Sequence, residues 1–251
     1  MKLKLSSISD QNLRESNQDN CLILSNSIKN SKTVLCLVAD GMGGLSDGEK
    51  ASKIVKETFE EFFKKDLCID AGFSSPEFYR EMKVRICRII TEANMKIIRY
   101  GEEHGVKLGT TLVLLFIYNN RYIVGNVGDS RAYLFSRKAE QLTRDQTAAQ
   151  DDIDSGVMTY EEAKTSRKSH ILTQCLGLNS ELDIDFSGGK FSKKDYFLLC
   201  SDGMYNRVEI DELEKIIRQK DRSTKKKLAD LVIKAKENGE SDNITGILIE
   251  A

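Results

Sequence analysis

The chain has 251 residues, of which 40% are hydrophobic and 31% charged, and its formal net charge is −1. This length and composition are ordinary for a globular enzyme with a sizeable core, and the near-zero charge excludes a global field that would attract nucleic acid or a membrane. The longest apolar stretches, such as 34–39 and 112–117, are too short to span a bilayer. The N-terminus lacks the apolar segment of a signal peptide, so we expect a cytoplasmic protein.

The N-terminal half is predicted to contain two strands followed by two helices. Apolar and β-branched residues at 20–25 and 33–39 favour short strands. The second strand runs into the glycine cluster 40–44, which we expect to form a tight turn. Apolar residues then recur at helical spacing in 48–65 and 75–104, which indicates a pair of amphipathic helices.

The central part predicts a meander of strands. Apolar runs at 110–118, 121–127 and 131–135 favour strands, and turn residues at 119–120 and 128–130 separate them. These segments are therefore expected to be neighbours in one sheet.

A polar segment, 143–182, interrupts this pattern. We expect it to leave the core as a flap, with short helices near 145–152 and 159–165. Strands are expected to resume at 183–187 and 195–200.

The C-terminal part predicts a turn at 201–203, helices at 209–219 and 223–238, and a last strand at 244–249. Along the whole chain, strands and helices do not alternate, which argues against a doubly wound parallel sheet. We predict a layered α+β fold in which two packed sheets carry helices on their outer faces.

Six cysteines are spread along the chain without a CxxC pair, and several lie in apolar, strand-like runs. This placement favours buried, reduced thiols over a zinc site or a disulfide framework. The cysteines are Cys21, Cys36, Cys68, Cys87, Cys175 and Cys200.

Four aspartates stand where predicted strands begin or end. Asp40, Asp129 and Asp202 each adjoin a glycine after an apolar strand, and Asp242 precedes the last strand. Carboxylates that converge at one sheet edge stay ionised together only beside a compensating charge. Mg²⁺ or Mn²⁺ provides that charge through oxygen ligands and lowers the pKa of a coordinated water, which can then attack a phosphate ester. A plainer interpretation stays open, because Asp and Gly are common turn residues.

The motifs of the chain, in their order, resemble the protein phosphatase 2C family of metal-dependent serine/threonine phosphatases, in its bacterial form. The resemblance covers nearly the whole length, and its most specific motif is Val-Ala-Asp-Gly-Met-Gly-Gly at 38–44. The other matching segments are 14–19, 48–52, 109–111, 126–131, 142–145, 156–159, 172–177, 199–203 and 241–245.

The resemblance implies a four-layer αββα sandwich, with residues 1–251 forming one domain and the flap at about 143–182. It implies hydrolysis of phosphoserine and phosphothreonine on proteins by water activated at a binuclear Mn²⁺ or Mg²⁺ centre. The expected partners are phosphorylated proteins, the substrates of a serine/threonine kinase, and neither nucleic acid nor membrane.

The resemblance also implies which residues hold the metals. Asp40 would bridge two ions, and the carbonyl of Gly41 would bind one of them. Asp202 and Asp242 would hold the other ion, and Asp129, with Asp202, matches a third and weaker metal position.

Two further residues are the candidate catalytic side chains. Arg14 is expected to hold the substrate phosphate by a bidentate contact, and Asp19 to order metal-bound water. Gln18, Ser201 and Asn243 are expected next to the metal ligands.

Several positions depart from the family pattern. Gln18 stands where Glu is usual, and its neutral amide predicts weaker binding of the second metal. Leu45 and Gln146 replace frequent histidines, and Ser-Arg at 166–167 replaces a frequent His-Pro.

The chain has only two histidines, His104 and His170. Neither is assigned as general acid, because a surface or structural role is the simpler interpretation. A metal-bound water is the preferred proton donor from the sequence alone.

Two alternatives to a broad phosphatase remain. A pseudophosphatase, a binding module without activity, is disfavoured because all four aspartates are present. A phosphatase dedicated to one regulatory protein, such as an anti-sigma antagonist, differs from a broad enzyme only in a substrate screen.

Overall fold

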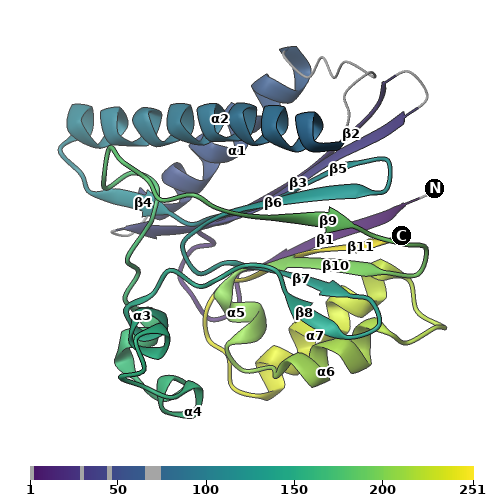
Figure 1. Ribbon diagram of the computed structural model, residues 1–251. Coiled ribbons are helices and arrows are strands. Elements are labelled where there is room, and N and C mark those ends of the chain that lie inside the picture. Colours follow the sequence, from purple (N-terminus) through teal and green to yellow (C-terminus); the bar gives the residue numbers. More distant parts are fainter. Residues whose placement is uncertain (1–2, 29–30, 44–46, 66–74) are drawn as a thin grey trace.

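The computed structural model describes residues 3–28, 31–43, 47–65 and 75–251. Two antiparallel sheets face each other and helices cover both outer faces, so that the layers run helix, sheet, sheet, helix (Figure 1). This arrangement confirms the predicted α+β class and the four-layer sandwich.

One sheet joins the two ends of the chain, in the strand order β1-β11-β10-β7-β8. Its strands are β1 (Lys4–Asp10), β7 (Arg131–Phe135), β8 (Ala139–Gln141), β10 (Tyr196–Cys200) and β11 (Ile244–Glu250). The antiparallel pair β1–β11 places Asp10 opposite Ile244. This register brings the segment after β1 beside the segment before β11.

The second sheet has the strand order β2-β3-β5-β6-β9, and a short strand, β4, pairs with the end of β3. Its strands are β2 (Asp19–Ile28), β3 (Ser31–Gly43), β4 (Leu108–Thr110), β5 (Leu112–Tyr118), β6 (Arg121–Val127) and β9 (Asp185–Lys190). The predicted strands at 20–25, 33–39 and 121–127 lie within this sheet. The expectation that 131–135 is their neighbour is wrong, because this segment is β7 and pairs with β10 in the other sheet.

Three apolar layers hold the sandwich together, because successive strand residues point to opposite faces. Leu37 packs on the helix side of the second sheet, and Val38 packs between the sheets. Leu199 likewise faces the space between the sheets, and Leu198 faces the helices of the other side. The helices are α1 (Asp47–Lys65) and α2 (Ser75–His104) on one side, and α5 (Asp202–Tyr205), α6 (Ile210–Ile217) and α7 (Thr224–Glu237) on the other.

The glycine cluster after residue 39 does not form the predicted tight turn in its described part. β3 instead continues to Gly43, because β4 supplies a hydrogen-bonding partner. Gly41 is needed there, since a Cβ atom would lie 2.0 Å from the carbonyl oxygen of Gly48 in α1. Asp40 therefore lies inside a strand; residues 44–46, which include the predicted departure at Leu45, lie outside the described residues.

The predicted turn at 201–203 is also wrong. Asp202 begins the one-turn helix α5, and Ser201 occupies its N-cap position. The structure also contains β1 and β8, which were not predicted, and the strand expected at 110–118 is interrupted at Thr111.

Residues 143–182 contain the expected short helices beside the two sheets (Figure 1). They form α3 (Ala148–Asp154), α4 (Tyr160–Ala163) and a 3-10 helix, η1 (Arg167–His170). An isolated bridge between Thr110 and Leu176 ties the end of this segment to β4. Its role as a flap in a single domain, 1–251, stays a prediction.

The cysteines in the described part of the chain are free thiols. Cys36, Cys175 and Cys200 are buried, as predicted, whereas Cys21 and Cys87 are only partly buried. Cys68 lies outside the described residues. Within the described ranges, no helix combines the length and the apolar character that crossing a bilayer requires.

Candidate active site

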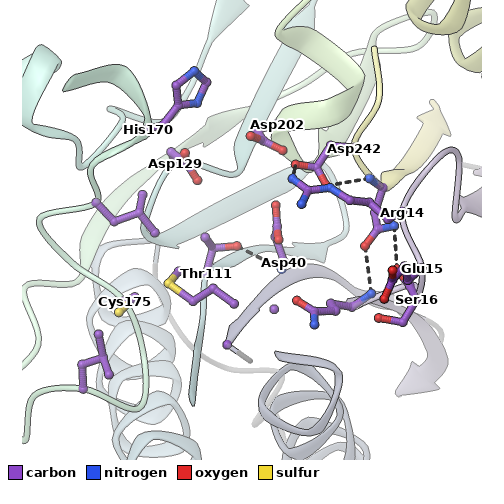
Figure 2. A pocket seen from close by; sticks show the side chains of 17 residues that line it. Arg14, Glu15, Ser16, Asp40, Thr111, Asp129, His170, Cys175, Asp202 and Asp242 are labelled. Atoms are coloured by element: carbon purple, nitrogen blue, oxygen red, sulfur yellow. Dashed lines mark hydrogen bonds and ion pairs between the residues drawn. The ribbon is translucent and has the colours of Figure 1, made fainter. Parts of the chain in front are cut away.

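A cleft of about 630 Å³ lies where strands of both sheets end. Asp40, Asp129, Asp202 and Asp242 all line it, and Arg14 lies beside them (Figure 2). The fold thus brings into one cleft four aspartates that are far apart in sequence. The remaining lining residues are Glu15, Ser16, Gln18, Gly41, Met42, Gly43, Thr111, His170, Leu172, Cys175, Leu178 and Asn243.

Thr111, at the break between β4 and β5, positions Asp40. Its hydroxyl oxygen accepts a hydrogen bond from the backbone N–H of Asp40 at 3.0 Å. The same hydroxyl lies 2.7 Å from that of Ser130, in the turn that carries Asp129. Thr111 therefore connects two of the aspartates, a role that the sequence did not indicate.

The turn that carries Asp129 is fixed by a glycine and a glutamine. Gly128 has a φ of 102°, which favours glycine, and its N–H donates to Oε1 of Gln146 at 2.7 Å. The hydroxyl of Tyr205 donates to the carbonyl oxygen of Asp129 at 2.9 Å. Gln146, noted as a departure from the usual histidine, thus connects this turn to residues 143–182, which are called the flap segment below.

A buried ion pair supports the same region. Arg131 and Asp145 approach to 2.6 Å, with a second hydrogen bond of 2.9 Å, and their side chains are 17% and 11% exposed. The Arg131 guanidinium also lies 3.6 Å from the centre of the Tyr205 ring. This bidentate, stacked geometry suits arginine and fixes the start of β7 behind Asp129.

Arg14 and Asp242 form an ion pair at the cleft, with 2.6 Å between Nη2 and Oδ2. Asn243 holds their two segments together: its Oδ1 accepts from the N–H of Gln18 at 2.9 Å, and its Nδ2 donates to the carbonyl of Ser16 at 3.0 Å. Gln18 and Asn243 both line the cleft.

Asp19 and Ser201 do not line the cleft but lie behind it. Asp19 is opposite Asp40 in the β2–β3 register, and its side chain is buried. The hydroxyl of Ser201 donates to Oδ2 of Asp19 at 2.8 Å. Burial raises the pKa of Asp19 to about 7, because a carboxylate loses its hydration there.

The cleft carboxyls resist ionisation in the absence of a further cation. Burial, followed by the charge of Asp242, raises the pKa of Asp202 to about 6. Burial and the neighbouring carboxylates also raise the pKa of Asp40 and Asp129 well above the usual range. In the described part of the chain, Oδ1 of Asp19 and Oδ1 of Asp202 are buried without a hydrogen-bond partner. Both observations indicate that positive charge is needed here beyond that of Arg14.

The chemistry of these donors fits a hydrated divalent cation. Among the described residues, no three His, Cys, Asp or Glu side chains converge on one metal position. Mg²⁺ in proteins is usually held by one or two carboxylates and keeps several waters. Asp40, the carbonyl of Gly41 and Asp202, with its unpartnered oxygen, are donors of that kind.

The flap segment supplies the remaining wall of the cleft through His170, Leu172, Cys175 and Leu178. The sequence did not place these side chains at the cleft, because the contact depends on how residues 143–182 return to the core. His170 is exposed, as a surface role requires, but it faces the aspartates (Figure 2).

The family model described as protein phosphatase 2C matches residues 10–232. The chain belongs to the protein phosphatase 2C family. The resemblance stated from the sequence motifs is thereby confirmed.

Relatives in the protein phosphatase 2C family match over almost the full chain. The serine/threonine phosphatase Stp of Listeria innocua is 31% identical over 243 residues, which cover 95% of this chain and 91% of the relative. Protein phosphatase PhpP of Streptococcus pneumoniae is 29% identical over 238 residues, covering 94% and 92%.

Solved structures agree with the sequence relatives. The crystal structure of the serine/threonine phosphatase Stp1 from Staphylococcus aureus matches with a TM-score of 0.90 and 27% identity, covering 100% of this chain and 96% of that one. The catalytic domain of the phosphatase PstP, in complex with two manganese ions, matches with a TM-score of 0.80 and 25% identity, covering 99% and 97%.

Proposed function

We propose that this chain is a protein serine/threonine phosphatase that hydrolyses phosphoserine and phosphothreonine on proteins by metal-dependent attack of water. One observation carries the proposal: in a chain of the protein phosphatase 2C family, four aspartates from both sheets meet Arg14 around one cleft. The named activity of the Listeria and Streptococcus relatives supports the same reaction class.

The proposed metal ligands are Asp40, the carbonyl of Gly41, Asp202 and Asp242 for two Mn²⁺ or Mg²⁺ ions, with Asp129 and Asp202 as a third, weaker position. When bound, such ions lower the pKa of coordinated water and place positive charge beside the phosphoryl oxygens. The raised pKa values of the carboxyls support this assignment, because bound cations offset the repulsion.

Arg14 is proposed to hold the phosphate of the substrate. Its planar guanidinium can donate two parallel N–H bonds to phosphoryl oxygens. The loop that carries it is anchored through Asn243, so that its approach to the cleft is fixed. Asp19 and Ser201, buried behind Asp40, are proposed to orient the metal ligands and their water.

The substrates are proposed to be products of a serine/threonine kinase, so that the chain reverses kinase signalling. The cytoplasmic location, the absence of nucleic-acid and membrane partners, and breadth of substrate choice stay predictions. A screen of phosphopeptides would separate a broad phosphatase from one dedicated to a single regulatory protein.

Hydrolysis of p-nitrophenyl phosphate and of a phosphoserine peptide, with and without Mn²⁺, tests the proposed function. We expect activity with Mn²⁺ and none in excess chelator. Asp40→Asn and Asp202→Asn are expected to lower kcat by at least about 10³-fold, because each removes a charged oxygen donor from the site. Asp221→Asn, which changes an exposed aspartate outside the cleft, is the matched control.

Two results would contradict this proposal. Wild-type turnover that persists in excess chelator would exclude the metal-dependent reaction. A folded wild-type protein that binds Mn²⁺ but hydrolyses neither substrate would favour the pseudophosphatase alternative.

A further inference from the structure

His170 is a titratable side chain of the cleft that the proposed metal and phosphate sites leave unused. It lies at the end of η1 and lines the cleft together with Asp129 and Asp202 (Figure 2). The charge of its imidazolium form offsets a small part of the rise in the pKa of Asp202. Within the described part of the chain, its ring has no hydrogen-bond or ion-pair partner.

The second histidine, His104, differs in each of these respects. It lies in the last turn of α2 and does not line the cleft. Its ring stacks on Tyr100 with centroids 4.0 Å apart, and Nδ1 lies 2.9 Å from the Tyr100 carbonyl oxygen. Only His170, of the two histidines in this sequence, can therefore reach a molecule bound in the cleft.

The backbone around His170 is held in place. The N–H of Ala148 in α3 donates to the carbonyl of Ile171 at 2.9 Å, and Thr147 and Leu172 form an isolated bridge. Lys168 of η1 forms an ion pair of 2.5 Å with Asp152 of α3. These contacts on both sides of residue 170 fix the point from which its side chain enters the cleft.

Hydrolysis of phosphoserine has a chemical requirement that the aspartates and Arg14 do not meet. The seryl oxygen is a poor leaving group as an alkoxide, so a proton donor near it accelerates the reaction. Arg14 cannot supply the proton, because a guanidinium stays protonated at any physiological pH. The Cys175 thiol is a weak donor whose pKa is raised by burial. Histidine titrates near neutral pH and serves this role most often.

The position of His170 also suits the direction in which the ester oxygen of the substrate would leave. Arg14 and Asp40 lie at the sheet ends, whereas His170 comes from the flap segment on the other wall of the cleft (Figure 2). A phosphate held at the sheet ends can direct its ester oxygen towards the flap and solvent, where the rest of a protein substrate has room. His170 is exposed on that side.

We propose that His170 is the general acid that protonates the departing seryl or threonyl oxygen. Water adds to phosphorus, the bond from phosphorus to the ester oxygen breaks with its electron pair moving to oxygen, and a ring N–H of the imidazolium gives its proton to that oxygen. The proton lost by the attacking water returns to the solvent, from which the imidazole is recharged. This inference rests on the proposed phosphatase function and adds the residue that the sequence left unassigned.

A comparison of two leaving groups tests the proposal. His170→Gln is expected to lower kcat/KM on a phosphoserine peptide by about 10²–10⁴-fold, and on p-nitrophenyl phosphate by less than about tenfold, because nitrophenolate departs without a proton. His104→Gln is the matched control and is expected to change neither value. A purely structural role for His170 would lower both values alike.

A measurement on the wild-type protein keeps the test independent of folding of the variant. With a general acid, kcat/KM across substituted phenyl phosphates depends only weakly on the pKa of the departing phenol; a steep dependence in the wild type would overturn the proposal. Equal losses on both substrates in His170→Gln, or no loss on the phosphopeptide, would overturn it as well. In each of these outcomes the wild-type protein still shows Mn²⁺-dependent hydrolysis. If the proposed phosphatase function itself is wrong, the wild-type protein shows no such hydrolysis.

Discussion

Arg14 and Asp242 are paired with each other although each is proposed to hold a different ligand. The 2.6 Å contact occupies Oδ2 of Asp242, which a divalent cation would also need. The same contact occupies part of the guanidinium that a phosphate would need. Metal binding at Asp242 would therefore release Arg14 towards the phosphate, and the two ligands are expected to strengthen each other's binding.

Replacing Arg14 separates its effect on metal binding at Asp242 from its effect on the substrate phosphate. Arg14→Gln is expected to tighten Mn²⁺ binding by up to about fivefold, since a partly exposed ion pair contributes only about 0.2–1 kcal/mol. Turnover of a phosphopeptide is expected to fall, because the bidentate phosphate contact is lost. Calorimetric titration of the metal-free protein with Mn²⁺ measures the first effect. Arg144→Gln, which breaks ion pairs with Asp151 and Asp154 outside the cleft, is the control. Weaker Mn²⁺ binding by Arg14→Gln would contradict the idea that Arg14 and the cation compete for Asp242.

At the scale of elements, the break between β4 and β5 places the hydroxyl of Thr111 between Asp40 in β3 and Ser130 in the turn before β7. Thr111→Val keeps the shape of the side chain but removes the acceptor for the Asp40 N–H and the contact with Ser130. We expect a loss of about 1–3 kcal/mol in the free energy of unfolding, because a buried donor is left unpaired. Mn²⁺-dependent turnover by Thr111→Val is expected to fall together with the free energy of unfolding. Thr111→Ser retains the hydroxyl, so equal melting temperatures and rates for the two variants would contradict this role.

Most elements could be predicted from sequence because their apolar pattern already reflects burial. Helix 75–104 and strands 121–127 and 131–135 agree with the structure at both ends. β1 was missed because its sequence, Lys-Leu-Ser-Ser-Ile-Ser-Asp, is mostly polar, and it becomes a strand only by pairing with β11. The turn expected after residue 39 failed for a related reason, since β4 extends β3 through the glycines.

The candidate site could be predicted only in part. The aspartates stand out in sequence because each combines a strand boundary with a glycine or asparagine neighbour. Thr111 and His170 carry no such signal: one acts through a backbone N–H 71 positions away, and the other reaches the cleft through the path of the flap segment. Contacts of this kind arise from tertiary packing and not from local spacing.

At the scale of the whole molecule, the carboxyls in and behind the cleft make the stability of the metal-free protein depend on pH. The pKa values of Asp19 and Asp202 are raised to about 7 and about 6, from an ordinary value of 3.8. Between the ordinary pKa and the raised pKa of each group, the folded state binds protons that the unfolded state has released. The free energy of unfolding therefore decreases as pH rises. The acids with lowered pKa values, such as Asp10 and Asp154, lose their contribution only as pH falls below about 4 and lie outside this window.

We therefore expect the melting temperature of the metal-free protein to fall between pH 5 and pH 8, by roughly 2–4 °C for each kcal/mol of lost stability in a chain of this size. Saturating Mn²⁺ is expected to reverse most of the fall at pH 8, since a bound cation stabilises the ionised carboxylates and the folded state that holds them. Thermal unfolding followed by circular dichroism, in chelator and in Mn²⁺ across this range, measures both effects. Asp19→Asn removes one of the titrating groups and should flatten the dependence in chelator, whereas the exposed change Asp221→Asn should leave it as in the wild type. A melting temperature that rises with pH in chelator would show that Asp19 and Asp202 are not the groups that control stability in this window.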